Sequence, residues 1–483
     1  MEDTHMKRSS GVLMHISSLW GAYSCGSFGE EAKRFADFLA DCGFTWWQVL
    51  PFCMIDECNS PYKSYSAFGG NPYFVDLPTL HKKGLLTSDE LSAAKQQTPY
   101  SCEYVRLYHT RCELLKAASK RVSNADREKI DEFISQNPYL DQFVKFMALK
   151  SANGEKCWNE WQTDEPDEEA LFLWKFIQYE FFSQWEEVKS YANSKGIKII
   201  GDIPFYVSYD SADVWANRKL FELTDDGAPK CVAGVPPDYF SANGQLWGNP
   251  LYNWDEMAKD GYSWWTARME HMLRMFDGVR IDHFRAVESY WSVDAKETTA
   301  KNGKWMPGPG KALVDRFNAI KGDRLIIAED LGVITDEVAS LVEYSTFPGM
   351  RVLQFGFLDS ADNPHLPHNY PNNCIAYTGT HDNNTLLGYV WELDEGTRKT
   401  MLEYCGYTSP DWNNGYSSII RSIYASNAGL VILPIQDLLG YGSDTRLNIP
   451  GKADGNWQYR VTEAQLGEIS KEKYKRLNFL YKR

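Results

Sequence analysis

The sequence predicts an α/β fold, a (β/α)8 TIM barrel, with inserted, mainly helical subdomains after the second and third strands and no C-terminal β-domain. Three observations lead to this prediction: eight short apolar runs, helical patterns between several of them, and carboxylates at the ends of several runs. A doubly wound open sheet is the competing architecture for alternating strands and helices. Eight strands of βα type favour the barrel, in which active sites lie at the carboxyl ends of the strands.

The first βα unit has the clearest signals. Residues 11–15 and 45–51 are apolar runs of strand length. Between them, four apolar residues recur at the spacing of one helical face, namely Ala32, Phe35, Ala36 and Leu39. Gly43 then provides a helix stop. Strand, helix and strand within this short segment indicate a βαβ unit.

Six further apolar runs complete the set of eight. They span residues 197–202, 278–282, 325–330, 350–355, 374–379 and 430–434. Two links between consecutive runs are much longer than one crossover helix. We therefore predict a single catalytic barrel over 1–483, with an inserted subdomain over 52–195 and an insertion with an active-site loop over 203–277. The segment after the last run is too short for a β-sandwich domain.

Composition and charge argue against several classes of protein. The chain of 483 residues has 43% hydrophobic and 24% charged residues and a net charge of −15. This charge makes nucleic acid a poor partner, and no apolar stretch is long enough for a membrane helix. A polar amino terminus without an apolar signal core predicts a cytoplasmic protein. The ten cysteines form no C-x-x-C pair or zinc-type cluster, so we expect reduced thiols and no metal site.

Aromatic residues make up 14% of the chain, including 17 Trp. Aromatic rings offer flat faces on which the C–H faces of pyranose rings can stack, so this bias favours an enzyme that acts on sugars. A large α/β core would also use many aromatic residues, and composition alone leaves both interpretations open.

Four carboxylates lie at or just beyond the ends of predicted strands: Asp202, Asp282, Glu329 and Asp382. A single carboxylate in such a position is usually a solvated loop residue or a helix cap. Four of them in register indicate a shared, partly desolvated cleft at the mouth of the barrel. His381 precedes Asp382 and could help it to hold sugar hydroxyls, although a lone His is more often a packing or surface residue.

Two carboxylates with different pKa values are the minimum equipment for cleavage of a glycosidic bond. Arg280 lies two residues before Asp282, so its side chain is expected on the same face of the strand. A guanidinium there would keep Asp282 ionised as a nucleophile, although it could also be an ordinary ion pair inside the barrel. Glu329 has no cation nearby in sequence and adjoins the like-charged Asp330, which favours the protonated form of an acid catalyst.

These residues resemble a known family. The motifs at 278–282, 327–330 and 380–383 resemble the nucleophile, acid/base and third-acid motifs of the α-amylase superfamily. Longer stretches are more specifically similar to the 4-α-glucanotransferases (amylomaltase or disproportionating enzyme) of glycoside hydrolase family 77. Two of these stretches run from the motif at 60–62 to that at 71–73 and from the motif at 201–204 to that at 213–215. The others are 234–240, 280–285 and 379–385.

The resemblance implies transfer of α-1,4-glucan segments with retained configuration and without an obligatory cofactor. It implies Asp282 as nucleophile, Glu329 as general acid/base and Asp382 as transition-state stabiliser. The residues that it implies for substrate binding are Arg280, His381, Asp202, Tyr62, Ser60, Asp238, Gln245, Trp247 and Asn448, with Pro450 beside the cleft. The implied substrates are maltooligosaccharides, amylose or glycogen-derived glucans, with glucose as an acceptor. Trp247 could instead be a packing residue that anchors its loop.

Two alternatives compete with the transferase. One is a hydrolase of the α-amylase type with the same three carboxylates, and the other is a glucan-binding protein that has lost catalysis. The intact Asp282, Glu329 and Asp382 argue against the second. The residue types account for bond cleavage with retention, whereas the preference for transfer over hydrolysis comes from the resemblance. The sequence does not distinguish a monomer from a dimer.

Overall fold

The eight predicted strands are all present and parallel. The computed structural model describes residues 6–55, 58–96, 98–237, 241–358, 360–409, 415–452 and 454–483. The eight strands are β1 Ser9–Leu13, β2 Trp46–Gln48, β3 Lys198–Ile203, β6 Gly278–Ile281, β9 Leu325–Ala328, β10 Gly349–Val352, β11 Cys374–Tyr377 and β12 Leu430–Pro434. Each lies within or overlaps one of the apolar runs, because strands that are covered on both faces need apolar side chains on both.

The strands close into a barrel. Their order is β10-β11-β12-β1-β2-β3-β6-β9, so the first strand of the chain pairs with the last, β12. The two ends of this order also meet, because the N–H of Ala328 at the end of β9 donates to the carbonyl of Pro348 just before β10, at 3.0 Å. The predicted (β/α)8 barrel is therefore confirmed.

Apolar side chains from several strands fill the barrel interior. Ile200, Ile327, Ile375 and Ile432 are fully buried in one cluster at the centre. On the outer face, a Cβ atom on Gly201 would lie 2.3 Å from the ring of Phe276, so only glycine allows this ring to approach β3. The barrel is thus a packed core, and the space for a ligand lies at its mouth.

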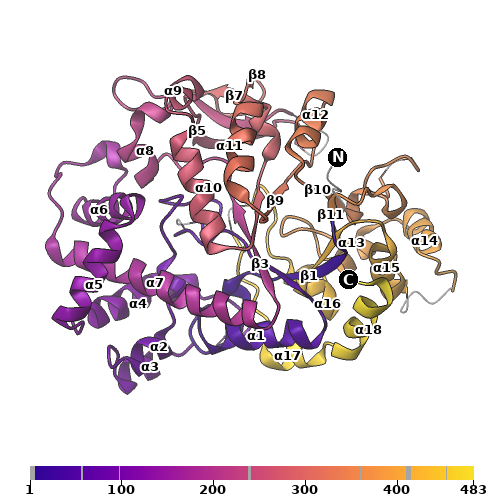
Figure 1. Cartoon of the computed structure of the whole chain (residues 1–483), viewed down its shortest axis with the longest axis horizontal. Helices are drawn as coiled ribbons and strands as arrows, with labels where there is room; N and C mark the ends of the chain where they lie inside the picture. Colours follow the sequence, from indigo (N-terminus) through magenta and orange to yellow (C-terminus); the bar gives the residue numbers. More distant parts are fainter. Residues whose placement is uncertain are drawn as a thin grey trace.

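Helices cover the outside of the barrel (Figure 1). They include α1 Glu30–Asp41, α10 Ser263–Met275, α11 Lys311–Lys321, α12 Asp336–Ser345, α13 Leu386–Glu392, α14 Glu395–Tyr404, α15 Gly415–Ala425, α16 Ile435–Leu439, α17 Glu463–Glu468 and α18 Lys471–Tyr481. The buried face of α1 includes the four apolar residues of the predicted helical face, and Gly43 follows the helix with a φ of +78°. None of the described helices is long and apolar enough to cross a membrane.

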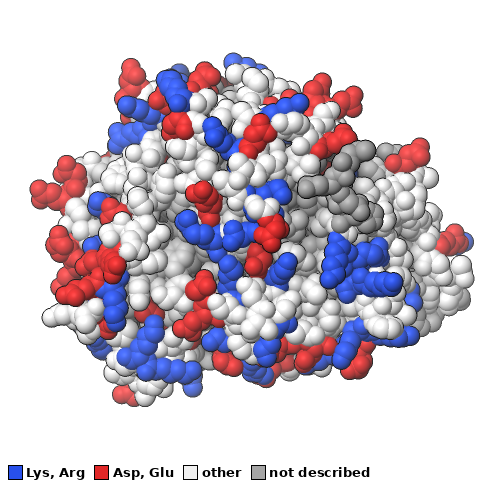
Figure 2. All heavy atoms as spheres, in the orientation of Figure 1, with Lys and Arg blue, Asp and Glu red and all other residues white. Residues whose placement is uncertain are grey.

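The link from β2 to β3 is helical. It contains α2 Leu77–Lys82, α3 Ser88–Ala93, α4 Tyr104–Ser119, α5 Asn124–Ser135, α6 Pro138–Ala152 and α7 Glu168–Ser194. The long helix α7 joins this group to the barrel, since its buried Trp185 donates a hydrogen bond to the carbonyl of Met275 at 3.0 Å. These helices form the left side of the molecule in Figure 1. On the face seen in Figure 2, acidic side chains gather over this side, and elsewhere both signs are interspersed.

A second sheet was not predicted. Strands β4 Cys231–Val235, β5 Gln245–Pro250, β7 Ser289–Asp294 and β8 Lys304–Pro307 form an antiparallel sheet in the order β5-β4-β7-β8. The insertion after β3, which we expected to be mainly helical, supplies β4 and β5 besides the short helices α8 Ala212–Ala216 and α9 Trp254–Lys259. The sequence pattern missed β5 and β8 because neither is an apolar run: β8 is mostly exposed, and β5 has a single buried residue. Figure 1 shows β5, β7 and β8 together at the top of the view.

Candidate active site

Two of the predicted carboxylates come from neighbouring strands of the barrel. Ile281 of β6 pairs with Ala328 of β9, so Asp282 and Glu329 each follow directly after a paired residue. Two backbone hydrogen bonds continue the sheet beyond the strand ends, from the N–H of Asp282 to the carbonyl of Ile203 at 2.9 Å and from the N–H of Glu329 to the carbonyl of Ile281 at 3.1 Å. Adjacent strands lie about 4.8 Å apart, so the backbone positions of Asp282 and Glu329 lie side by side.

Arg280 links two carboxylates. Its Nη1 lies 2.9 and 2.7 Å from the two carboxylate oxygens of Asp202, and its Nη2 lies 2.7 Å from Oδ1 of Asp282. The side chains of Arg280 and Asp202 are buried, with exposed fractions of 5% and 0%, whereas Asp282 keeps 30%. Arg280 therefore faces the same side of β6 as Asp282, as their spacing predicts, and it presents Asp282 to the cavity.

The ion pair does not by itself set the ionisation of Asp282. Removal from bulk water raises the pKa of Asp282 above its ordinary value, Arg280 opposes this shift, and the negative charge of Asp202 adds to it. The expectation that the guanidinium of Arg280 keeps Asp282 ionised is thus met only in part, because Arg280 lowers the pKa of Asp282 but the net shift is upward. The direct contact with Arg280 still favours the ionised form of Asp282 over that of its neighbour Glu329, for which the described residues show no ion pair.

Backbone amides hold Glu329. The N–H of His283 donates to Oε2 at 2.7 Å, and the N–H of Leu331 donates to Oε1 at 2.8 Å. Burial at the barrel mouth raises the pKa of Glu329 to about 7, Arg280 lowers it in part, and the adjacent Asp282 raises it further. Glu329 is therefore a group that can gain and lose a proton near neutral pH, which a general acid/base needs.

The turn after Asp282 makes one of these amide contacts possible. His283 has a φ of +54°, in the left-handed region that residues other than glycine rarely adopt. Such strained positions concentrate at functional sites, and this one directs an N–H toward Glu329. The expected rise in the pKa of Glu329 is present, with burial and Asp282 as its main causes. Asp330, which the sequence suggested as a contributor, pairs with Arg351 at 3.0 Å.

The third carboxylate lies in a different environment. Asn448 donates from Nδ2 to Oδ1 of Asp382 at 2.6 Å, and Nε2 of His381 lies 3.3 Å from Oδ2. Burial would raise the pKa of Asp382, but His381 and Asn448 outweigh it and hold the pKa well below the ordinary range. Burial lowers the pKa of His381, and the carboxylate of Asp382 more than compensates, so the pKa of this imidazole is raised.

Tyr62 connects the two halves of the mouth. Its hydroxyl donates to Oδ2 of Asp202 at 2.6 Å, and its ring stacks on His381 with centroids 4.9 Å apart and an angle of 13° between the planes. Trp457 packs against both rings, at 5.9 Å from Tyr62 and 5.8 Å from His381. These contacts fix the ring of Tyr62 beside the carboxylates.

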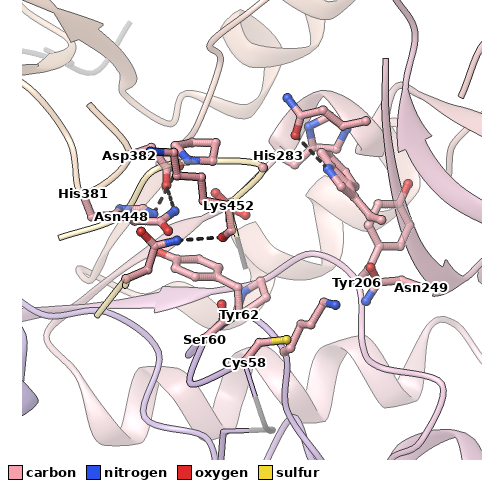
Figure 3. Close-up of a pocket in the computed structure, with 18 of the residues that line it drawn as sticks. Cys58, Ser60, Tyr62, Tyr206, Asn249, His283, His381, Asp382, Asn448 and Lys452 are labelled. Carbon is pink, nitrogen blue, oxygen red and sulfur yellow. Dashed lines mark hydrogen bonds and ion pairs between the residues drawn. The ribbon is translucent and has the colours of Figure 1, made fainter. Parts of the chain in front are cut away.

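A cavity of about 460 Å³ opens above these groups. Its lining includes the predicted residues Ser60, Tyr62, Gln245, Trp247, Asp282, His381, Asp382, Asn448 and Pro450. In Figure 3, Asp382, His381 and Asn448 lie on one wall, and His283 and Tyr206 lie on the opposite wall. Asp202 and Arg280 lie behind this lining. Glu329 lies next to the lining, where its carboxylate accepts a hydrogen bond from the backbone N–H of His283. Asp238 lies outside the described residues.

Trp247 both packs and lines the cavity. Its indole N–H donates to Oε1 of Gln245 at 3.2 Å, and its ring meets His283 edge-on at 4.8 Å. Sequence reasoning did not single out several further residues of the lining, including Lys63, Tyr206, His283, Lys452 and Trp457. Only His283 had a usable signal, because it directly follows a strand that ends in a carboxylate.

The arrangement has the chemistry of an enzyme that acts on glycosidic bonds. A barrel mouth holds two adjacent carboxylates, one in direct contact with a cation and one with a pKa of about 7, beside a third that stays ionised. This separation of pKa values assigns different tasks to like groups. Within the described residues, no cluster of His, Cys, Asp and Glu has the makings of a metal site.

Comparisons with known proteins identify the family. A family model described as 4-alpha-glucanotransferase matches residues 14–465. The 4-alpha-glucanotransferase of Streptococcus pneumoniae serotype 4 is 42% identical over 99% of this chain and 98% of its own length. The enzyme of the same name from Thermus thermophilus is 40% identical over 98% of both chains. The structure of an amylomaltase from Streptococcus agalactiae in complex with acarbose matches with a TM-score of 0.95 and 37% identity, over 99% of this chain and 100% of that one.

The chain belongs to the 4-alpha-glucanotransferase family. It is therefore an enzyme of the glycosyltransferase class, and the comparisons favour transfer over the α-amylase-type hydrolysis that the carboxylates alone left open.

Proposed function

We propose that this protein moves a segment of an α-1,4-glucan to the 4-hydroxyl of another glucan or of glucose, by a retaining double displacement. Asp282 is the nucleophile, Glu329 the general acid/base and Asp382 the stabiliser of the transition state. One observation carries these roles. Glu329, with a pKa of about 7, lies beside Asp282, which is in contact with a guanidinium.

In the first step, a carboxylate oxygen of Asp282 forms a bond with the anomeric carbon. The glycosidic C–O bond breaks, and the leaving oxygen takes the proton of Glu329, so the piece with the reducing end departs as an alcohol. Positive charge develops on the sugar ring in the transition state. The ionised Asp382, held by Asn448 and His381, supplies a fixed negative charge near this ring.

In the second step, Glu329 has lost its proton and acts as the base. It takes the proton from the 4-hydroxyl of an acceptor glucan, whose oxygen attacks the anomeric carbon as the ester bond to Asp282 breaks. Two inversions give net retention, and both carboxyl groups return to their starting states. A pKa near 7 suits Glu329 to both directions of proton transfer.

The remaining cavity residues would bind the sugars. We propose that Tyr62 stacks on the ring at the cleavage site, and that Ser60, Asp202, Arg280 and His381 hold this ring or the nucleophile. Gln245, Trp247 and Asn448 would contact the glucan chain on either side, and we propose a substrate-binding role for Asp238 as well, which lies outside the described residues. The edge-on contact of Trp247 with His283 places an aromatic wall beside the nucleophile, which would exclude water and favour an acceptor sugar.

Several broader features are part of the same proposal. The substrates would be maltooligosaccharides, amylose or glycogen-derived glucans, which places the enzyme in maltose, starch or glycogen metabolism. Residues 1–483 would act as one catalytic unit in which the segments 52–195 and 203–277 are insertions. A cytoplasmic location is supported by buried free thiols at Cys25, Cys42, Cys102 and Cys374.

Incubation with maltotriose tests the proposed reaction. Transfer predicts glucose together with a ladder of longer maltooligosaccharides, while the number of reducing ends stays nearly constant. A hydrolase would instead release reducing ends without longer products, and that result would overturn the proposal. Chromatography of the products and a reducing-sugar assay on the same samples distinguish the two outcomes.

A further inference from the structure

Trp305 is an exposed aromatic residue whose position the reaction does not explain. It lies on β8, an edge strand of the second sheet, with 41% of its surface exposed. Strand β8 belongs to the link that leaves the carboxyl end of β6, directly after Asp282. The link therefore starts on the active-site side of the barrel.

The indole ring of Trp305 is held in place from two sides. The guanidinium of Arg285 lies 3.9 Å from the ring centroid and covers part of the ring. Trp291, directly opposite in the β7–β8 ladder, contacts it with centroids 5.2 Å apart and an angle of 66°. Trp291 is itself fixed by a hydrogen bond from its indole N–H to the carbonyl of Ala300 at 2.8 Å. A ring that is already ordered loses little entropy when a ligand stacks on it.

The same guanidinium connects Trp305 to the catalytic loop, by which we mean the segment from Glu329 to Val333 that follows β9. Arg285 follows Asp282 by three residues, and its Nη1 donates to the carbonyl of Val333. Val333 follows Leu331, whose N–H holds Glu329, and its side chain is 67% exposed. One buried arginine, three residues after Asp282, therefore contacts both the ring of Trp305 and the backbone of Val333, four residues after Glu329.

A row of paired residues connects the cavity to Trp305 on one face of the sheet. The buried Ala300 packs over its middle members, Gly234 and Trp291, so a glucan would pass over the segment that carries Ala300. Leu246 of β5, which lines the cavity, pairs with Gly234 of β4. Gly234 pairs with Trp291 of β7, and Trp291 pairs with Trp305. Paired residues lie on the same face, and three strand spacings amount to about 14 Å. This distance is within the reach of a chain of a few pyranose rings.

We propose that Trp305 stacks against a pyranose ring of an α-glucan chain, another part of which occupies the cavity. The class of ligand rests on the proposed function, because a glucan presents the same ring at every step along its length. The indole offers a flat, ordered, apolar face, and the C–H face of glucose is its natural counterpart. Only a chain longer than the cavity can reach Trp305, so the site favours long donors or acceptors over maltotriose.

Steady-state kinetics of Trp305→Ala in the full chain test the site. We expect the KM for amylose to rise about five- to tenfold, the size of one stacking contact, with little change in kcat. The kinetics with maltotriose should stay within twofold of wild type. Trp305→Phe should recover part of the loss, because it restores an aromatic face. Trp391→Ala is the matched control, since Trp391 is also exposed, at 55%, but lies on α13 outside this sheet.

A binding measurement separates this inference from the proposed reaction. In native gels that contain amylose, Asp282→Ala should be retarded, and Asp282→Ala with Trp305→Ala should be retarded clearly less. Equal retardation, or an unchanged KM for amylose, would overturn the site. An equal loss on amylose and maltotriose would overturn it as well, because it would mean that Trp305 acts through the catalytic loop. Failure of wild type to transfer maltotriose would reject the proposed function, and amylose retardation would still report on Trp305.

Discussion

Glu329 and Asp382 lie at the same barrel mouth, yet their surroundings shift their pKa values in opposite directions. Glu329 is held by two backbone N–H groups, and burial raises its pKa to about 7. Asp382 is held by an amide and an imidazole, which keep its pKa well below the ordinary range. The groups in direct contact with each carboxyl, and not the cavity that both share, therefore decide which of the two carries a proton at neutral pH.

The largest expected effect is that of replacing Asp282, the neighbour of Glu329. Asp282→Ala removes the carboxylate that we propose forms the covalent intermediate, so transfer on maltotriose should fall by about 10⁴-fold or more. Binding of maltoheptaose, measured by calorimetry, should persist because the rest of the cavity is unchanged. Activity close to that of wild type would show that Asp282 is not the nucleophile.

Glu329→Gln tests whether Glu329 supplies the proton to the leaving oxygen. It should lower the rate on maltotriose by about 10³-fold, because the leaving oxygen no longer receives a proton. α-Maltosyl fluoride needs no such proton, so its first displacement should remain fast in Glu329→Gln and be lost in Asp282→Ala. Release of fluoride measures this step, and equal losses on both donors would contradict the role of Glu329 as the acid.

Asn448→Ala should raise the pKa of Asp382, which would make it more like that of Glu329. Loss of the 2.6 Å hydrogen bond from Asn448 raises the pKa of Asp382 and frees its carboxylate to move. We expect kcat to fall about tenfold and the acidic limb of the pH profile to move to higher pH. Asn456→Ala, which removes a cavity-lining amide that bonds only to backbone groups among the described residues, is the control and should leave the acidic limb in place.

A further expected effect, on stability and not on activity, concerns a carboxyl deeper behind the same mouth. Asp437 is fully buried and bonds to the hydroxyl of Thr378 and to the N–H of Leu386. Burial raises its pKa from 3.8 to about 6, and these two hydrogen bonds lower it only in part. The folded state therefore holds the proton more tightly, and stability should decrease, by about 3 kcal/mol at most, as the pH rises from about 4 to about 7.

Asp437→Asn isolates this contribution, because the amide resembles the protonated carboxyl. Urea unfolding of wild type and Asp437→Asn at pH 4 and pH 7 measures it. The two proteins should be similar at pH 4, and the variant should lose less stability on going to pH 7. The same loss in both proteins would show that Asp437 is ionised at little cost in the folded state.

Sequence reasoning found the barrel because each of its strands is a short apolar run, and found Asp282 and Glu329 because both follow such runs. It missed β8, since three of the four residues of Lys304–Pro307 are exposed and carry no apolar pattern. It predicted the raised pKa of Glu329, but not that burial and Asp282 are its main causes. Asp330 pairs with Arg351, which lies on a different strand and far away in sequence. The backbone N–H of His283 points to Glu329 because His283 has a left-handed conformation, and the sequence has no glycine there that would have indicated it.

The most direct test of the account is to titrate the carboxyl groups by infrared difference spectroscopy. Wild type should show a protonated carboxyl band that disappears as the pH rises through about 7, and this component should be absent in Glu329→Gln. Bands of other buried carboxyl groups, such as Asp437, should be common to both proteins and cancel in the comparison. A band titrating near pH 7 that persists in Glu329→Gln, or the lack of any such band in wild type, would contradict the assignment of the proton to Glu329.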